Sequence, residues 1–144
     1  MAQAMQDYLT FLKGQVEGYE GDYQEIVSHV PTYFTLLTGL LDDSRFPPEL
    51  RPLVNCALAY FISPFDFGSD EAVGAEGYVD DVYVCALAIG KIKERIDDRQ
   101  VMLDHWEGEE DVFALSDNII ETLDKELGEE SVDLIRQYTG LDVA

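Results

Sequence analysis

Apolar residues recur every three or four positions along most of the chain, which is the spacing of amphipathic helices. This spacing predicts helices over residues 8–14, 22–42, 48–63, 78–99, 112–127 and 130–139, and a short helix or turn within 97–108 around Trp106. Pro31 interrupts the second stretch, so we expect a kink or two abutting helices there. Because no strand-like alternation competes with these patterns, the sequence predicts an all-α fold.

Two of the predicted helices, over 48–63 and 78–99, are apolar on nearly every face for part of their length. Val82 to Ile89 is an uninterrupted apolar run, and Leu53 to Ile62 is broken only by Asn55. A helix of this kind is enclosed by other elements. We therefore expect a single-domain helical bundle over residues 1–144, with about five to seven helices around a central antiparallel hairpin of these two. The apolar runs are shorter than the roughly 20 residues of a transmembrane helix.

The two cysteines lie within this predicted hairpin. Cys56 stands 8 residues before Pro64, and Cys85 stands 8 residues after Gly77. In an antiparallel hairpin the two side chains would therefore lie at the same level and face one another. Their spacing indicates neither a zinc site nor a disulfide framework. We expect free thiols packed in the core.

The net charge of the chain restricts the classes of partner that we expect. The chain has 30 Asp and Glu against 9 Lys and Arg, a formal net charge of −21. Such a surface repels phosphate backbones and anionic lipids, so we expect neither direct nucleic-acid binding nor membrane association. The acids are spread over 42–43, 70–81, 97–98, 104–111 and 121–133. This spread favours salt adaptation or plain acidity over an acidic nucleic-acid mimic, which would need an ordered stripe.

The sequence carries no recognisable catalytic constellation. It has no phosphate loop, dinucleotide-binding glycine motif or nucleophile elbow. His29 and His105 have no identifiable catalytic partner, so we expect both to be structural or exposed. These absences favour a non-enzymatic domain. The first residues also lack the basic and apolar regions of a signal peptide, so we expect a cytoplasmic protein.

The most informative segment is residues 60–81, YFISPFDFGSDEAVGAEGYVDD, between the two central helices. It resembles the DUF1232 (YkvA-like) family, whose pattern is an apolar helix ending in Ser-Pro-x-Asp, then an acid, a glycine and an Asp pair that opens the next helix. The residues that fit are Tyr60, Ser63, Pro64, Asp66, Asp70, Gly77, Tyr78, Asp80 and Asp81. The chain departs from the pattern at Ser69, where members usually have proline, and in a longer spacing from Asp70 to Gly77. The resemblance covers about residues 50–92.

The resemblance implies a helical domain of unknown biochemical role, and some family members are described as membrane-associated. It implies no catalytic residues. From the residues themselves, Pro64 ends one helix, Gly77 permits an unusual backbone angle before the next, and Asp80 and Asp81 lie in the first turn, where carboxylates satisfy backbone N–H donors. The first interpretation of this corner is thus a polar scaffold in which Ser63, Pro64, Gly77 and Tyr78 are structural.

Two further interpretations of the corner stay open. One is a divalent metal site for Mg²⁺, Ca²⁺ or Mn²⁺, held by carboxylates of Asp66, Asp70, Asp80 and Asp81. The other is a partner-binding loop. We expect a protein–protein interaction or regulatory role, with a protein partner or a homo-oligomer. A metal-dependent activity at the Asp corner, and an acidic mimic or salt-adapted protein, are the alternatives.

Overall fold

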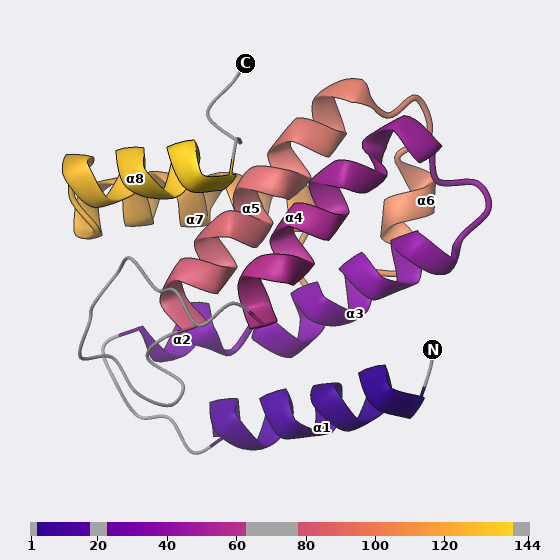
Figure 1. Cartoon of the computed structure of the whole chain (residues 1–144), viewed down its shortest axis with the longest axis horizontal. Helices are drawn as coiled ribbons and strands as arrows, with labels where there is room; N and C mark the ends of the chain where they lie inside the picture. The colour runs from indigo at the N-terminus through magenta and orange to yellow at the C-terminus, as the bar shows by residue number, and fades with distance from the viewer. Residues whose placement is uncertain (1–2, 18–22, 63–77, 140–144) are drawn as a thin grey trace.

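The structure is a computed structural model that describes residues 3–17, 23–62 and 78–139. Every regular element in these ranges is a helix, which confirms the predicted all-α class (Figure 1). The elements in chain order are α1 (Gln3–Glu17), α2 (Gln24–Val27), α3 (Val30–Asp42), a 3-10 turn η1 (Pro48–Leu50), α4 (Arg51–Ile62), α5 (Tyr78–Arg95), α6 (Gln100–Leu103), α7 (Val112–Glu126) and α8 (Glu129–Thr139).

The predicted central hairpin is α4 and α5, which lie side by side and run in opposite directions (Figure 1). α5 contacts α2, α3 and α7 as well as α4, whereas α1 and α6 pack against α3. Its apolar run is buried at every position from Val82 to Ile89. Toward its end Glu94 and Arg95 are exposed while Ile92 and Ile96 are buried, so this part of the chain has one covered side and one solvent side.

The expectation that α4 is enclosed on every side is wrong. Val54, Ala57 and Tyr60 are buried, but Asn55 and Ala59 are exposed. α5 and α3 pack against two sides of α4 and leave the side that carries Asn55 and Ala59 in solvent. An exposed alanine costs little free energy, because its side chain has little apolar surface to bury. The apolar composition of α4 therefore suggested more burial than the helix has.

The interruption at Pro31 takes the form of two abutting helices. α2 ends at Val27, α3 begins at Val30, and Pro31 stands in the first turn of α3. Proline is tolerated there because the N–H that it lacks has no partner within the helix. Pro48 likewise opens a helical turn, the 3-10 turn η1 that leads into α4.

α1 is longer than predicted. It continues through Gly14 to Glu17, whereas the sequence placed its end near Gly14. An interior glycine costs a helix about 1 kcal/mol relative to alanine. Leu12 is fully buried and Val16, beyond the glycine, also packs against the core, so tertiary contacts offset that cost.

The predicted apolar stripe of α7 is confirmed: Val112, Leu115, Ile119 and Leu123 are buried. Glu109, Glu110 and Asp111 precede the helix, whose first turn holds no acidic residue. Asp111 is its N-cap, and the side chain accepts a hydrogen bond from the backbone N–H of Phe113 at 3.4 Å. Gly128 has a φ of 85° and joins α7 to α8 through the left-handed conformation that glycine adopts without strain.

Candidate functional site

The predicted Asp corner is described only on its α5 side. Asp66, Asp70, Ser63, Pro64 and Gly77 lie outside the described residues. Tyr78 is the first residue of α5, and both aspartates of the pair lie in its first turn, as the sequence predicts. Asp80 and Asp81 are only 1% and 8% exposed, which is unusual for carboxylates.

The charge of Asp81 affects the pKa of one side chain on α1 and of another within the α4–α5 hairpin. Burial raises the pKa of the Cys85 thiol well above its usual value, and nearby Asp81 and Cys56 raise it further. Burial also raises the pKa of the Tyr8 hydroxyl, again with a contribution from Asp81. Both cysteines are free thiols, as expected, and Cys56 affects Cys85 across the α4–α5 interface. Within the described ranges, no group of three or more His, Cys, Asp and Glu side chains is arranged to hold a metal ion.

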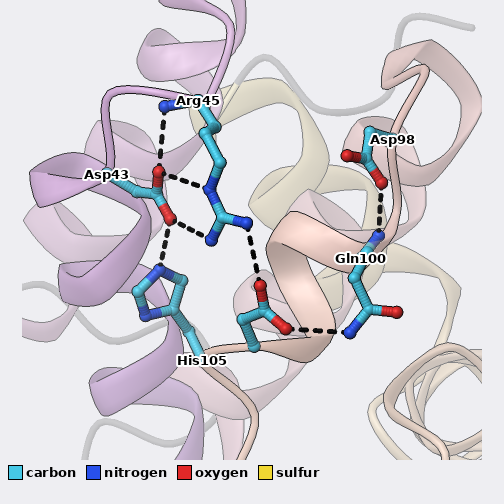
Figure 2. A network of polar contacts seen from close by, with 6 residues as sticks. Asp43, Arg45, Asp98, Gln100 and His105 are labelled. Carbon is cyan, nitrogen blue, oxygen red and sulfur yellow. Dashed lines mark hydrogen bonds and ion pairs between the residues drawn. The ribbon is translucent and has the colours of Figure 1, made fainter.

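A polar network that the sequence did not reveal ties the end of α3 to α6 (Figure 2). The backbone N–H and the Nε–H of Arg45 donate to Oδ1 of Asp43 at 2.9 and 3.1 Å, and Nη2 lies 2.7 Å from Oδ2. Nη1 of Arg45 reaches Oδ2 of Asp104 at 2.9 Å, at the end of α6. The guanidinium therefore joins two carboxylates that are far apart in sequence.

His105 completes this network. Its Nε2–H donates to Oδ2 of Asp43 at 2.8 Å, since an ionised carboxylate can only accept. Its Nδ1 lies against α3, where a Cβ built on Gly39 would come within 2.5 Å of it. The hydrogen bonds from Arg45, followed by that from His105, hold the pKa of Asp43 well below its usual range. His105 thus acts as a structural clamp, one of the two roles expected for it.

An open depression of about 600 Å³ lies beside this network. It is lined by Thr35, Gly39, Asp42, Asp43, Ser44, Arg45 and His105. The guanidinium of Arg45 is already engaged by two carboxylates, and one ring nitrogen of His105 is held by Asp43. Each cationic group that lines the depression therefore has an anionic partner.

The segment that follows α5, residues 97–111, is rich in exposed acidic residues. It contains α6 and seven exposed acids: Asp97, Asp98, Asp104, Glu107, Glu109, Glu110 and Asp111. Leu103 is 40% exposed among them. We call residues 97–111 the acidic segment.

Local contacts fix the acidic segment to the bundle. Trp106 packs against Tyr33 of α3 with ring centroids 5.3 Å apart, and its indole N–H donates to the carbonyl of Glu110 at 2.7 Å. Its ring also covers Gly108, where a Cβ would lie 2.6 Å from the indole. Trp106 is therefore a packed side chain rather than an exposed interface aromatic, and its contacts tie the backbone at Glu110 to α3.

A third polar cluster joins α5, α7 and α8. The hydroxyl of Tyr83 donates to Asp124, and Nε of Arg136 donates to that hydroxyl at 3.2 Å. Arg136 also lies 3.6 Å from the Asp124 carboxylate. Burial, together with the hydrogen bond to Asp124, raises the pKa of Tyr83 to about 12, so the hydroxyl remains a donor throughout the physiological range.

Some of these contacts had a local sequence signal and others had none. Asp43 and Arg45 stand two residues apart in a predicted turn, a spacing at which an Asp side chain hydrogen-bonds backbone and neighbours. His105 lies 62 residues from Asp43, and Arg136 lies 53 from Tyr83. Pairings at these separations depend on how the helices pack, which no local pattern encodes.

Comparison with known proteins agrees with the sequence resemblance. The model of the family described as "Protein of unknown function (DUF1232)" matches residues 52–87, which confirms the resemblance and places it on α4 and the first half of α5. The chain is also similar to "Uncharacterized protein ORF9" of Methanothermobacter thermautotrophicus, with 29% identity over 125 residues, covering 87% of this chain and 84% of that protein. No solved structure matches the chain. In the described residues, no helix combines the length and apolar character that crossing a membrane requires.

Proposed function

We propose that the chain, whose residues 52–87 match the DUF1232 model, is a non-enzymatic helical module that binds a basic protein partner through its acidic segment. The observation that carries this proposal is the fixed array of seven exposed carboxylates over residues 97–111. Arg99 is the single Lys or Arg among residues 97–111, so the segment carries a large excess of acidic residues. A concentrated charge of one sign speeds the encounter with a partner of the opposite sign.

Two features favour a specific surface over general acidity. Trp106 and the Arg45–Asp104 ion pair hold the segment in place, so less conformational freedom is lost on binding. Leu103 adds an exposed apolar contact on α6, and protein interfaces commonly surround an apolar centre with polar residues. A lysine-rich segment with one or two apolar side chains is the partner that this arrangement fits.

The proposal is tested with a matched pair of charge variants. One replaces Glu107, Glu109 and Glu110 with glutamine. The control replaces Glu94, Glu129 and Glu130, which are also exposed but lie outside the segment. Binding of a defined lysine-rich peptide is followed by surface plasmon resonance at several salt concentrations. We expect the first variant to slow association about tenfold more than the control, with the difference shrinking as salt screens the charges. If the association rate fell equally in the two variants, net charge alone would explain the effect, and the proposal would be overturned.

A metal-dependent role of the Asp corner is the second candidate, and the burial of Asp80 and Asp81 at the start of α5 favours it. Carboxylates withdrawn from water are stabilised by a cation, and Mg²⁺, Ca²⁺ and Mn²⁺ prefer oxygen ligands. Asp66 and Asp70 would complete the donor set. A thermal melt in each metal against EDTA at matched ionic strength tests this candidate, because a ligand of the folded state raises the melting temperature. An unchanged melting temperature in all three metals would remove it.

A further inference from the structure

Arg99 lies over an aromatic ring at the edge of the acidic segment. Its guanidinium carbon is 5.4 Å from the ring centroid of Phe113, in the first turn of α7. Cations bind the face of an aromatic ring at this range, and arginine does so more often than lysine. Nη2 of Arg99 also donates to the carbonyl of Lys93 on α5 at 3.4 Å, which is long for a hydrogen bond. Weak contacts therefore hold this guanidinium against the start of α7.

Arg99 is not neutralised by the acids of its own segment. Among the described residues, no carboxylate lies within ion-pairing distance of its guanidinium, although the segment carries seven exposed acids. Arg45, by contrast, pairs with two carboxylates. Because Arg99 is exposed and rests on a ring, a second cation can displace it without breaking an ion pair.

Acidic side chains border the Phe113 ring along the chain. Asp111 accepts a hydrogen bond from the backbone N–H of Phe113, and Asp117 stands one turn further along α7, on the same side of the helix. Asp117 is exposed and lies 3.3 Å from Nζ of Lys93. An arginine can stack on an aromatic face while its N–H groups point outward to carboxylates. The Phe113 surface therefore has the chemistry that receives a guanidinium, and one from the same chain occupies it.

We infer that Arg99 is an intramolecular competitor, and that an arginine of the basic partner takes its place on the Phe113 ring. The inference rests on the proposed function, because it assigns a guanidinium to one position of the partner that the acidic segment binds. The exchange replaces one ring-bound cation by another, so the contact that Arg99 loses is restored by the partner. In the free chain Arg99 lowers the affinity for the partner, because only molecules whose ring is vacated can accept it.

The test compares two peptides by surface plasmon resonance on the full chain: a lysine-rich peptide, and the same peptide with its central lysine replaced by arginine. Arg99→Gln removes the competitor. Arg95→Gln is the matched control, because it removes one exposed positive charge just before the segment. We expect Arg99→Gln to bind the arginine peptide about two- to five-fold more tightly than Arg95→Gln does, the range for an exposed cation over a ring.

Phe113→Leu keeps an apolar side chain and removes the aromatic face. In this background the two charge variants should bind alike, and the preference for the arginine peptide should disappear. Thermal melts check that each variant is folded.

The outcomes separate this inference from the proposed function. Equal affinities of Arg99→Gln and Arg95→Gln, or an unchanged difference between them in the Phe113→Leu background, would overturn the inference and leave the proposed function standing. Weaker binding by Arg99→Gln than by the wild-type chain would assign Arg99 a structural role and also overturn the inference. If neither peptide bound the wild-type chain, both would be overturned.

Discussion

The hydroxyl of Tyr33 on α3 and the Oγ of Ser116 on α7 lie 2.7 Å apart in the buried core. Burial raises the pKa of Tyr33 above its usual value, so its hydroxyl stays protonated and able to donate at any ordinary pH. Trp106 packs on the same tyrosine ring. The pair therefore joins two helices that are far apart in sequence and supports the tryptophan that holds the acidic segment.

Removing one member of this pair should cost stability. Tyr33→Phe or Ser116→Ala leaves a buried hydroxyl without its partner, and we expect either variant to lose about 1–2 kcal/mol in the free energy of unfolding, measured with urea. The double variant should be less destabilised than the sum of the two, because neither hydroxyl is then left unsatisfied. Strict additivity of the two losses would show that the hydrogen bond does not couple the residues.

Gly39 should not tolerate a side chain. A Cβ at this position would come within 2.5 Å of Nδ1 and 2.9 Å of Cγ of His105, so Gly39→Ala must displace the ring and weaken its bond to Asp43. We expect a loss of about 1–3 kcal/mol in unfolding free energy, typical of overpacking. Gly14 and Gly90 also lie within helices but have open space beside them, so alanine there should be neutral or stabilising by up to about 1 kcal/mol. Equal effects at all three glycines would contradict this account of His105.

The Asp43 network should contribute to stability only when its carboxylate is ionised. The pKa of Asp43 is lower in the folded chain than in the unfolded chain. Its contribution is therefore complete above the unfolded-state value near pH 4 and is lost as the pH falls through the lower folded-state value. We expect Asp43→Asn to lower the urea midpoint relative to wild type at pH 7, with the difference narrowing below about pH 4. Asp42→Asn, at the exposed neighbouring position, is the control and should show a smaller effect at pH 7.

Salt should stabilise the folded chain. With a net charge of −21 the compact state repels itself, and raising ionic strength from about 0.01 M to about 1 M shortens the Debye length from roughly 30 Å to roughly 3 Å. We expect the melting temperature to rise steadily over this range in NaCl, as a salt-adapted or simply acidic surface requires. A melting temperature independent of NaCl would count against self-repulsion as a significant destabilising term.

The sequence predicted most of the fold because helices are encoded locally. The apolar spacing located α7, the run from Val82 to Ile89 located the buried half of α5, and Pro31 marked the break between α2 and α3. Local pattern was wrong where tertiary packing decides: Gly14 does not end α1, and Ala59 is exposed although its helix is apolar. The network of Asp43 and His105 was not predicted for the same reason, because it forms only when α3 and α6 have come together.

The separation of 62 residues between Asp43 and His105 also bears on the time course of folding. Bringing distant positions together requires closure of a long loop, whose entropic cost disfavours such contacts early in folding. An interaction absent from the transition state leaves the folding rate unchanged and slows unfolding. A contact between Asp43 and His105 that forms only after the transition state would slow unfolding, and so lengthen the lifetime of the folded chain, without changing the folding rate.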